Sequence, residues 1–410
     1  MLTRRLLLKS LAAAGLSLFP LSRGSWALAG AQQAEKHLIV ILLRGAIDGL
    51  SVVAPYAEAN YYALRPNIAL AKPGATDGLL DLDGFFGLHP ALAPLLPYWQ
   101  DRSLAFIHAS GSPALSRSHF EAQDILETAM LNTALARQGW LNGLAQILPD
   151  NHAADRAISV GNVMPKIFQG KASISTMPTN LRADKPSAID NPQLEKKFAQ
   201  LYATHPELAS HYQRAVSARA VMLADLQAEM SDADRGAPNS DAFINMSEKV
   251  AELLRHDSHI QLVFMDVGGW DTHIAQGNAK GQLAGKLEKF GQGLAALIQG
   301  LGPAYQNTAI LVMSEFGRTV AENGNKGTDH GHGNVAWLLG GDVQGGKVHG
   351  RWPGLDSEQL WEGRDLAVTT DFRAVIGNVV GRHFGLSDVA VQGFISDYRA
   401  DLGLAGLFKV

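Results

Sequence analysis

The sequence of 410 residues contains no cysteine. This absence excludes disulfides, thiolate metal sites, iron–sulfur clusters and cysteine nucleophiles. An excess of one charge is also lacking, since 35 basic residues nearly balance 39 acidic ones and the net charge is −4. Aromatic residues make up only 7% of the chain. The sequence therefore lacks the basic, aromatic-rich pattern of a nucleic-acid-binding protein, and we expect no nucleic-acid partner.

Long apolar runs are missing as well. A membrane-spanning helix needs about 20 consecutive apolar residues, and no stretch of this sequence reaches that length. The hydrophobic fraction of 46% is ordinary for a globular protein. At roughly 100–200 residues per domain, the length allows two or three small domains or one large α/β domain.

The first 31 residues have the pattern of an export signal. A basic stretch with Arg4 and Arg5 precedes the apolar residues 11–21, and residues 27–29 fit a small-x-small cleavage site. The paired arginines are typical of a twin-arginine signal, with an ordinary secretory signal as the alternative. We expect a mature protein that is periplasmic or secreted and without a membrane anchor, with the twin-arginine export machinery as a partner.

Short apolar runs alternate with amphipathic stretches in the rest of the chain. This alternation predicts an α/β domain over residues 32–410, in which a central, mostly parallel sheet has helices on both faces. Residues 192–255 read as a helical insertion. The expected strands are 37–43, 104–109, 260–267, 308–313 and 335–339, and the expected helices are 90–99, 120–130, 139–147, 279–299 and 372–383.

Polar residues of catalytic or metal-binding type follow the first two expected strands. Ligands of open α/β sheets bind beyond the carboxyl ends of the strands. Asp48, flanked by glycines, reads as a metal ligand or as a turn residue. Ser116 and Ser118 precede an expected helix, where a serine is a helix cap or a nucleophile. His119 beside them is a candidate base.

The later strand ends carry a denser set of candidate ligands. Asp271 and His273 offer one oxygen and one imidazole nitrogen in a glycine-containing loop, a pairing suited to Zn²⁺ and similar ions. Glu315 is a candidate ligand, and Arg318 can bind an anion through two N–H groups. The last group, spaced by glycines, contains Asp329, His330 and His332.

No nucleotide cofactor is expected. The run Gly331-x-Gly333-x-x-Ala336 matches a relaxed dinucleotide fingerprint. It precedes an expected strand, however, whereas the true motif follows a strand and opens a helix. A Gly-x-Ser-x-Gly nucleophile motif and a phosphate-binding Walker loop are also absent from the sequence.

Taken together, these motifs resemble the domain-of-unknown-function family 1501, whose members are often twin-arginine exported proteins. The resemblance covers about residues 37–408. It is carried in order by the runs beginning at Arg44, Ser116, Gly269, Ser314 and Gly327 and by the glycine pairs at 340–341 and 345–346. That family is similar in turn to the alkaline phosphatase and sulfatase superfamily, whose sites hold one or two divalent metals.

The resemblance implies a role for each candidate residue. Asp48 would match the first metal-binding acid, and Ser118 (or Ser116) the nucleophile. Asp271 and His273 would match a ligand pair, and His330 or His332 the final histidine. Glu315 falls where the superfamily has an Asp-His pair, although no histidine follows it here.

The sequence thus predicts an exported, metal-dependent hydrolase of phosphate or sulfate esters, acting on a small-molecule or polymer ester. Ser118 would be the nucleophile, and Arg318 would hold the non-bridging oxygens. The cation would be Zn²⁺, Mn²⁺, Mg²⁺ or Ca²⁺, held by residues from the set Asp48, Asp271, His273, Glu315, Asp329, His330 and His332. The alternative is a non-catalytic exported protein that keeps the fold to bind a ligand or a partner, with Arg44 and Arg318 neutralising the carboxylates.

Overall fold

A computed structural model of the chain describes residues 35–114, 116–149, 156–161, 163–177 and 234–409. The expected export signal at 1–31 and most of the expected helical insertion, up to residue 233, lie outside these residues. Among the helices that are described, none has the length and apolar character needed to cross a membrane.

The described residues form an alternating series of strands and helices. The strands are β1 (His37–Leu43), β2 (Val53–Ala54), β3 (Leu80–Asp81), β4 (Gly87–Leu88), β5 (Leu104–Gly111), β6 (Ala157–Val160), β7 (Ser175–Met177), β8 (Leu262–Val267), β9 (Thr308–Ser314), β10 (Asn334–Gly340), β11 (Val348–His349) and β12 (Thr370–Asp371). The α-helices are α2 (Gly49–Val52), α3 (Ala59–Leu64), α4 (Leu96–Gln100), α5 (His119–Thr128), α6 (Trp140–Ile147), α9 (Ser240–His256), α10 (Gln282–Leu301), α11 (Phe372–Phe384) and α12 (Asp388–Gln392). The 3₁₀ helices are η1 (Pro90–Leu95), η2 (Thr133–Leu135), η3 (Lys166–Phe168), η4 (Gly302–Asn307) and η5 (Leu402–Leu404).

Nine of these strands join one sheet in the order β11-β5-β10-β9-β1-β8-β6-β7, with β12 also paired to β5. Strand β1 pairs in parallel with β8 and β9, and β6 pairs in parallel with β7 and β8. Strand β10 is antiparallel to both of its neighbours, β5 and β9. The predicted fold class, an α/β protein with a mostly parallel central sheet, is therefore confirmed.

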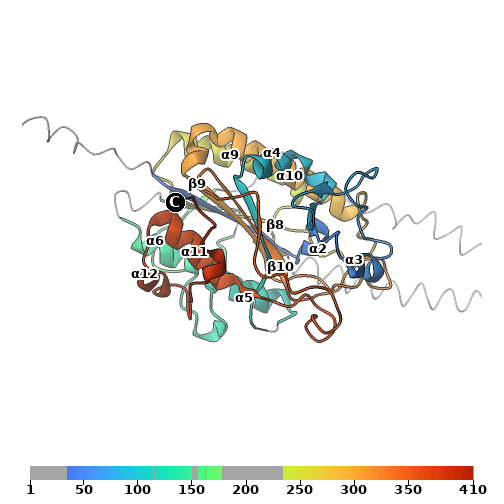
Figure 1. The fold of residues 1–410 in the computed structure, drawn as a ribbon. Helices are drawn as coiled ribbons and strands as arrows, with labels where there is room; N and C mark the ends of the chain where they lie inside the picture. Colours follow the sequence, from blue (N-terminus) through green and yellow to red (C-terminus); the bar gives the residue numbers. More distant parts are fainter. Residues whose placement is uncertain (1–34, 115, 150–155, 162, 178–233, 410) are drawn as a thin grey trace, which may run out of the picture. The chain divides into compact units, whose positions relative to one another are not determined.

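Helices cover both faces of this sheet (Figure 1). Every residue of β1 is buried, because its alternating side chains enter two separate cores. Ile39, Ile41 and Leu43 pack with α4, α9, α10 and η1, whereas Leu38, Val40 and Leu42 pack with α5, α6, α11 and α12. Burying one such side chain contributes roughly 1.5–3 kcal/mol, so the two cores stabilise the sheet from both sides.

The segment of the expected insertion that is described is helical and packs on the sheet. Helix α9 buries Phe243, Met246 and Val250 against the core that contains α10. Strands β6 and β7 precede the expected insertion and β8 follows it, and all three lie in the same sheet. The strands on either side of the expected insertion therefore belong to one sheet, while the insertion itself stays a prediction because residues 192–233 lie outside the described residues.

The direction of β10 decides where the polar loops meet. Because β10 runs against its neighbours, its first residues lie at the same edge of the sheet as the carboxyl ends of β1, β5, β8 and β9. The segment before β10 therefore lies at the same edge of the sheet as the segments that follow those four strands. This edge brings together residues that are up to about 280 positions apart in the sequence.

Candidate metal centre

Four side chains from three segments of this sheet edge lie together, and three of them, His119, Asp271 and His330, bring one ligand atom each to a common point. His119 is the first residue of α5, Asp271 and His273 follow β8, and His330 precedes β10. We call these four residues the histidine–aspartate cluster. His119 and Asp271 are buried, and the side chains of His273 and His330 are each only 12% exposed.

The Nε2 atoms of the three histidines face one another around the Asp271 carboxylate. Nε2 of His330 lies 3.0 Å from Nε2 of His119 and 3.0 Å from Nε2 of His273. Oδ1 of Asp271 lies 3.0 Å from Nε2 of His273, and Oδ2 lies 3.7 Å from Nε2 of His119. One ligand atom each from His119, Asp271 and His330 lies within 4.8 Å of the other two, close enough to share a cation.

Each of these imidazoles is oriented through its other nitrogen. Nδ1 of His119 bonds to Oε1 of Glu315 at 2.8 Å, Nδ1 of His273 to Oδ1 of Asp329 at 3.2 Å, and Nδ1 of His330 to the carbonyl of Arg117 at 2.9 Å. Because these oxygens are acceptors, the protons are assigned to the Nδ1 atoms. The Nε2 lone pairs are then directed at the common point, the arrangement found in histidine-bound metal sites.

Without a cation, a proton compensates the charges of the cluster. Burial alone would lower the pKa of His119, but the adjacent carboxylates of Asp271 and Glu315 outweigh it and raise the pKa to about 9. Burial and the nearby charges of Arg318 and His119 hold the pKa of His330 below its ordinary value, despite its hydrogen bond to Asp271. Nε2 of protonated His119 therefore donates to Nε2 of neutral His330. The shared proton lies near the point where a cation would be held.

The two buried carboxylates of the site are held in their ionised form. Burial would raise the pKa of Asp271, but the neighbouring imidazoles of His119, His273 and His330 and the charge of Arg318 lower it far below its usual range. Burial would likewise raise the pKa of Glu315, yet the bond and charge of His119 hold it at about 2. Within the described residues, Oδ2 of Asp271 is buried and has no hydrogen-bond partner.

The donor set fits a divalent transition metal. A tetrahedral zinc with Zn–N distances of 2.0–2.1 Å separates its nitrogen ligands by about 3.3 Å, close to the 3.0 Å between Nε2 of His330 and each of the other two Nε2 atoms. A buried, unpartnered carboxylate oxygen is costly unless a cation neutralises it. Imidazole nitrogens suit zinc and its neighbours, whereas Mg²⁺ and Ca²⁺ prefer oxygen ligands.

Glycines allow the segments of the site to lie this close together. A Cβ on Gly317 would overlap the carbonyl oxygen of Gly333, and a Cβ on Gly331 would overlap the backbone of Arg318. Backbone bonds join the same pieces, since the amide of Gly331 donates to the carbonyl of Gly317 at 2.8 Å. The glycine spacing around His330 and His332 therefore serves close backbone packing.

Arg318 has a different environment from the one expected of an anion-binding residue. Its guanidinium is buried and donates to the carbonyls of Gly45, Ala46 and Thr328 and to Oδ1 of Asp271. These bonds use four of its five N–H groups. Arg318 therefore neutralises Asp271 and ties three loops together, and it is not exposed to a substrate.

Asp48 is likewise engaged by protein groups. Its carboxylate accepts from Arg65 Nη1 at 2.6 Å and Nη2 at 3.0 Å, and also from Ser51 and Gln276. Burial would raise its pKa, but Arg65 and these donors hold the pKa below its usual value. The guanidinium thus occupies the position beside Asp48 where a metal was expected.

The remaining candidates lie around the cluster without facing its centre. Glu315 and Asp329 bind the Nδ1 atoms of His119 and His273, so they orient ligands. Nε2 of His332 bonds to the carbonyl of Ser112 at 2.8 Å. The geometry thus separates these three residues from the histidine–aspartate cluster.

The two serines differ in their surroundings. Ser118 is exposed at the N-cap of α5, where its side chain makes no capping hydrogen bond. The hydroxyl of Ser116 donates to Glu121 at 2.8 Å. Of the two, Ser118 directly precedes a cluster residue and has the more available hydroxyl.

The sequence interpretation considered His119 only as a base and missed it as a ligand. A histidine that opens a helix directly after a strand-end loop was the available signal. Arg44 does neutralise carboxylates, but those of Glu127 at 3.0 Å and Asp266 at 2.7 Å, rather than those of the cluster. Through Gln123 it also contacts the group around Glu315.

Residues 35–395 match the family described as "Protein of unknown function (DUF1501)". This match confirms the family that the motifs resembled. No curated protein matches the sequence.

Several solved structures share the general fold. A protein in the alkaline phosphatase superfamily from Vibrio parahaemolyticus is 10% identical, with a TM-score of 0.39; the match covers 77% of this chain and 63% of that chain. The zinc complex of the C-terminal periplasmic domain of EcEptC from Escherichia coli is 10% identical, with a TM-score of 0.36 and coverage of 75% and 73%. A 2-O GAG sulfatase is 10% identical, with a TM-score of 0.33 and coverage of 77% and 66%. At this level the functional assignment depends on the chain's own residues.

Proposed function

The chain belongs to the DUF1501 family, and on that premise we propose that it is a metal-dependent hydrolase of phosphate or sulfate esters with one divalent cation at the histidine–aspartate cluster. The observation that carries the proposal is the gathering of imidazole Nε2 atoms around the Asp271 carboxylate, whose Oδ2 atom is buried without a hydrogen-bond partner. Zinc is the expected ion, because two of the three donors that share a common point are imidazole nitrogens.

The protein's own groups prepare the site for an ester. His119, His330 and Asp271 would hold the cation, with His273 beside them, while Glu315 and Asp329 fix the rings of His119 and His273. Arg318 keeps Asp271 ionised, so its second oxygen is ready to bind. When bound, the cation supplies Lewis-acid polarisation of an ester oxygen and lowers the pKa of a nucleophile beside it.

Ser118 is the proposed nucleophile on the protein. Its exposed hydroxyl stands at the N-terminus of α5, one residue before His119. The N-terminus of a helix stabilises an anion through its unpaired N–H groups and its dipole. Negative charge that develops on the transferred group would therefore be stabilised at this end of α5.

The second candidate function is non-catalytic ligand or partner binding. It is favoured by the ion pairs of Arg318 with Asp271 and of Arg65 with Asp48, because each guanidinium already neutralises a carboxylate of the site. Export to the periplasm or the exterior by the twin-arginine route suits both functions and is part of the proposal. The ester would be a small molecule or part of a polymer.

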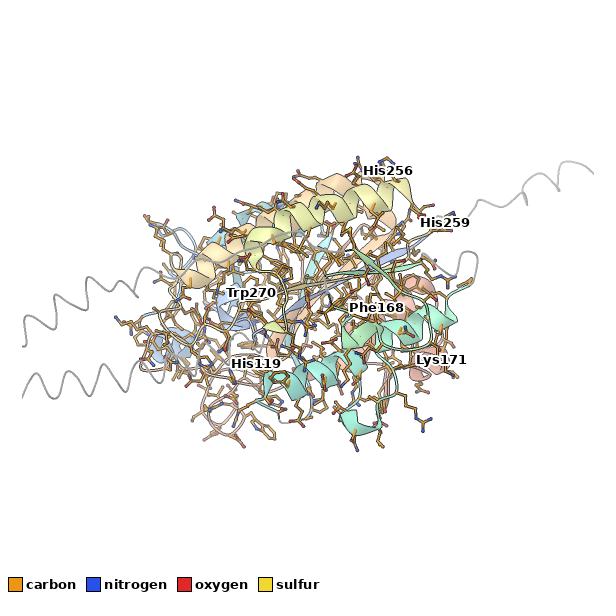
Figure 2. The ribbon with its side chains drawn as sticks, turned by 180° about the vertical axis from the view of Figure 1, so that it is seen from behind. His119, Phe168, Lys171, His256, His259 and Trp270 are labelled. Atoms are coloured by element: carbon orange, nitrogen blue, oxygen red, sulfur yellow. The ribbon has the colours of Figure 1, made fainter. Side chains whose placement is uncertain are left out.

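Metal analysis combined with an ester assay tests the hydrolase proposal. Protein purified without chelators should carry one zinc per chain and hydrolyse 4-nitrophenyl phosphate or 4-nitrophenyl sulfate. His330→Ala should lose both the metal and the activity. His256→Ala is the matched control, because His256 is exposed at the end of α9, on a different element from the cluster (Figure 2).

The opposite result is equally clear. Wild-type protein that carries no metal and gains no thermal stability from zinc, manganese, magnesium or calcium would contradict the hydrolase proposal and favour the binding protein. A metal that is retained in His330→Ala would place the metal site elsewhere.

A further inference from the structure

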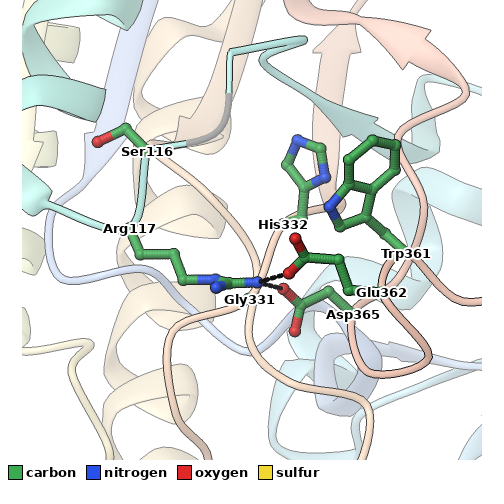
Figure 3. Close-up of a pocket in the computed structure, with 7 residues that line it drawn as sticks. All are labelled: Ser116, Arg117, Gly331, His332, Trp361, Glu362 and Asp365. Atoms are coloured by element: carbon green, nitrogen blue, oxygen red, sulfur yellow. Dashed lines mark hydrogen bonds and ion pairs between the residues drawn. The ribbon is translucent and has the colours of Figure 1, made fainter.

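A pocket of about 220 Å³ opens beside the cluster (Figure 3). Arg117 and Gly331 line one side of it, and Trp361, Glu362 and Asp365 line the other. Pockets for drug-sized ligands span about 300–1,000 Å³. This pocket therefore has room for a single ring rather than for a larger ligand.

The pocket wall is continuous with the cluster. Gly331 directly follows His330, and the carbonyl of Arg117 accepts from Nδ1 of His330 at 2.9 Å. Arg364, next to Asp365, donates to the carbonyl of His330. A group seated in the pocket would therefore lie next to an ester held at the cluster.

Trp361 presents an aromatic surface to this pocket. Its side chain is 41% exposed, which is unusual for a large aromatic residue, and its ring makes an edge contact with His332 at 5.7 Å. Two backbone bonds between Trp361 and Asp365, of 2.8 and 3.0 Å, fix the turn that carries the indole. An exposed, fixed indole is suited to stacking against a ring.

The polar groups of the pocket are nearly balanced in charge. Asp365 is fully buried and pairs with Arg117 at 2.9 Å and with Arg364 at 2.8 Å. Glu362 is 57% exposed and pairs with Arg117 at 2.8 Å through one oxygen. Since Arg117 in the lining and Arg364 beside it pair with both carboxylates, the lining favours an uncharged group. A bare hydrocarbon ring would remove water from these groups without replacing its hydrogen bonds.

We propose that this pocket binds the leaving group of the substrate and that this group is a single uncharged ring bearing hydroxyl groups, of the monosaccharide class. The ring stacks on Trp361, and its hydroxyls bond to Glu362 and Arg117. The proposal rests on the proposed ester hydrolase, because the ester bond places the ring beside the cluster.

Binding measurements on the full chain distinguish the contribution of the ring to affinity from that of the phosphate group. The probes are glucose 6-phosphate, phenyl phosphate, inorganic phosphate and methyl α-D-glucopyranoside, titrated by calorimetry and by tryptophan fluorescence. Glucose 6-phosphate should bind at least tenfold more tightly than inorganic phosphate and more tightly than phenyl phosphate. Trp361→Ala should weaken the binding of glucose 6-phosphate about tenfold, because one ring stack is lost. The affinity for inorganic phosphate should stay unchanged.

Two further variants control for folding and for side-chain chemistry. Trp361→Phe keeps an aromatic face and should restore most of the affinity. Leu135→Ala changes a 65% exposed side chain that does not line the pocket and should have no effect.

The outcomes distinguish this proposal from the hydrolase proposal. Equal affinity for glucose 6-phosphate and inorganic phosphate would overturn the ring pocket while leaving the metal site intact. Equal affinity for glucose 6-phosphate and phenyl phosphate would overturn the hydroxyl-bearing ring. If the protein holds no metal but methyl α-D-glucopyranoside still binds in a Trp361-dependent manner, the hydrolase fails and the ring pocket stands.

Discussion

Replacing Glu315 by glutamine should weaken zinc binding while preserving the fold. Oε1 of Glu315 accepts from the amide of Gly45 at 2.8 Å, from Nδ1 of His119 at 2.8 Å and from Nε2 of Gln123 at 2.9 Å. The glutamine carbonyl can accept the same three bonds, so the shape and the donors remain. What disappears is the negative charge that makes His119 a stronger ligand.

The expected size of the effect follows from that single change. Loss of an outer carboxylate partner of a metal-bound histidine reduces metal affinity by about 10–100-fold, equivalent to about 1.4–2.7 kcal/mol. Competition with a chromogenic zinc chelator measures this directly. Glu252→Gln, an exposed change on α9, is the control. Unchanged zinc affinity in a folded Glu315→Gln protein would refute the idea that Glu315 orients His119 toward a cation.

Three further changes test other parts of the account. Arg65→Met should lower the free energy of unfolding by about 3–5 kcal/mol, because it leaves buried Asp48 unpaired; chemical denaturation measures this against the exposed Arg255→Met. Because the pKa of Asp48 is depressed, the ion pair stabilises the wild type above about pH 4, and this contribution fades as the pH falls below that value. The difference in free energy of unfolding between the wild type and Arg65→Met should therefore shrink in acid, and a difference that stays constant would count against the pairing. Gly317→Ala should destabilise the protein by about 1–3 kcal/mol or more and weaken zinc binding, because its Cβ overlaps the carbonyl of Gly333, whereas Gly285→Ala in α10, with open space around its Cβ, should leave zinc affinity unchanged. Arg4→Lys combined with Arg5→Lys should hold the precursor in the cytoplasm, as judged by cell fractionation, and undiminished export would assign the signal to the ordinary secretory route.

The long elements of the fold were predictable from the sequence because each has a strong periodic pattern. The expected strand 37–43 coincides with β1 (His37–Leu43), and the expected helix 372–383 ends one residue before the end of α11. The short strands β6 and β7 were missed, since four and three residues give no usable periodicity. The reversed direction of β10 was not predicted either, because it depends on pairing between distant strands.

The candidate site was predictable only as a set of residue types at strand ends. Asp271, His273 and His330 lie together in the structure, as that reasoning expected. The sequence could not show which side chains point at the centre of the cluster and which only orient a histidine ligand, because this depends on side-chain direction. Glu315 and Asp329 therefore looked like ligands, and Arg65, which neutralises Asp48, showed no signal at all.

Anomalous diffraction at the zinc absorption edge, from crystals of the protein purified without chelators, tests the central claim most directly. The account predicts one anomalous peak, within bonding distance of Nε2 of His119, Nε2 of His330 and an Asp271 oxygen. No peak at this cluster, with Arg318 as the sole cation beside Asp271, would contradict it.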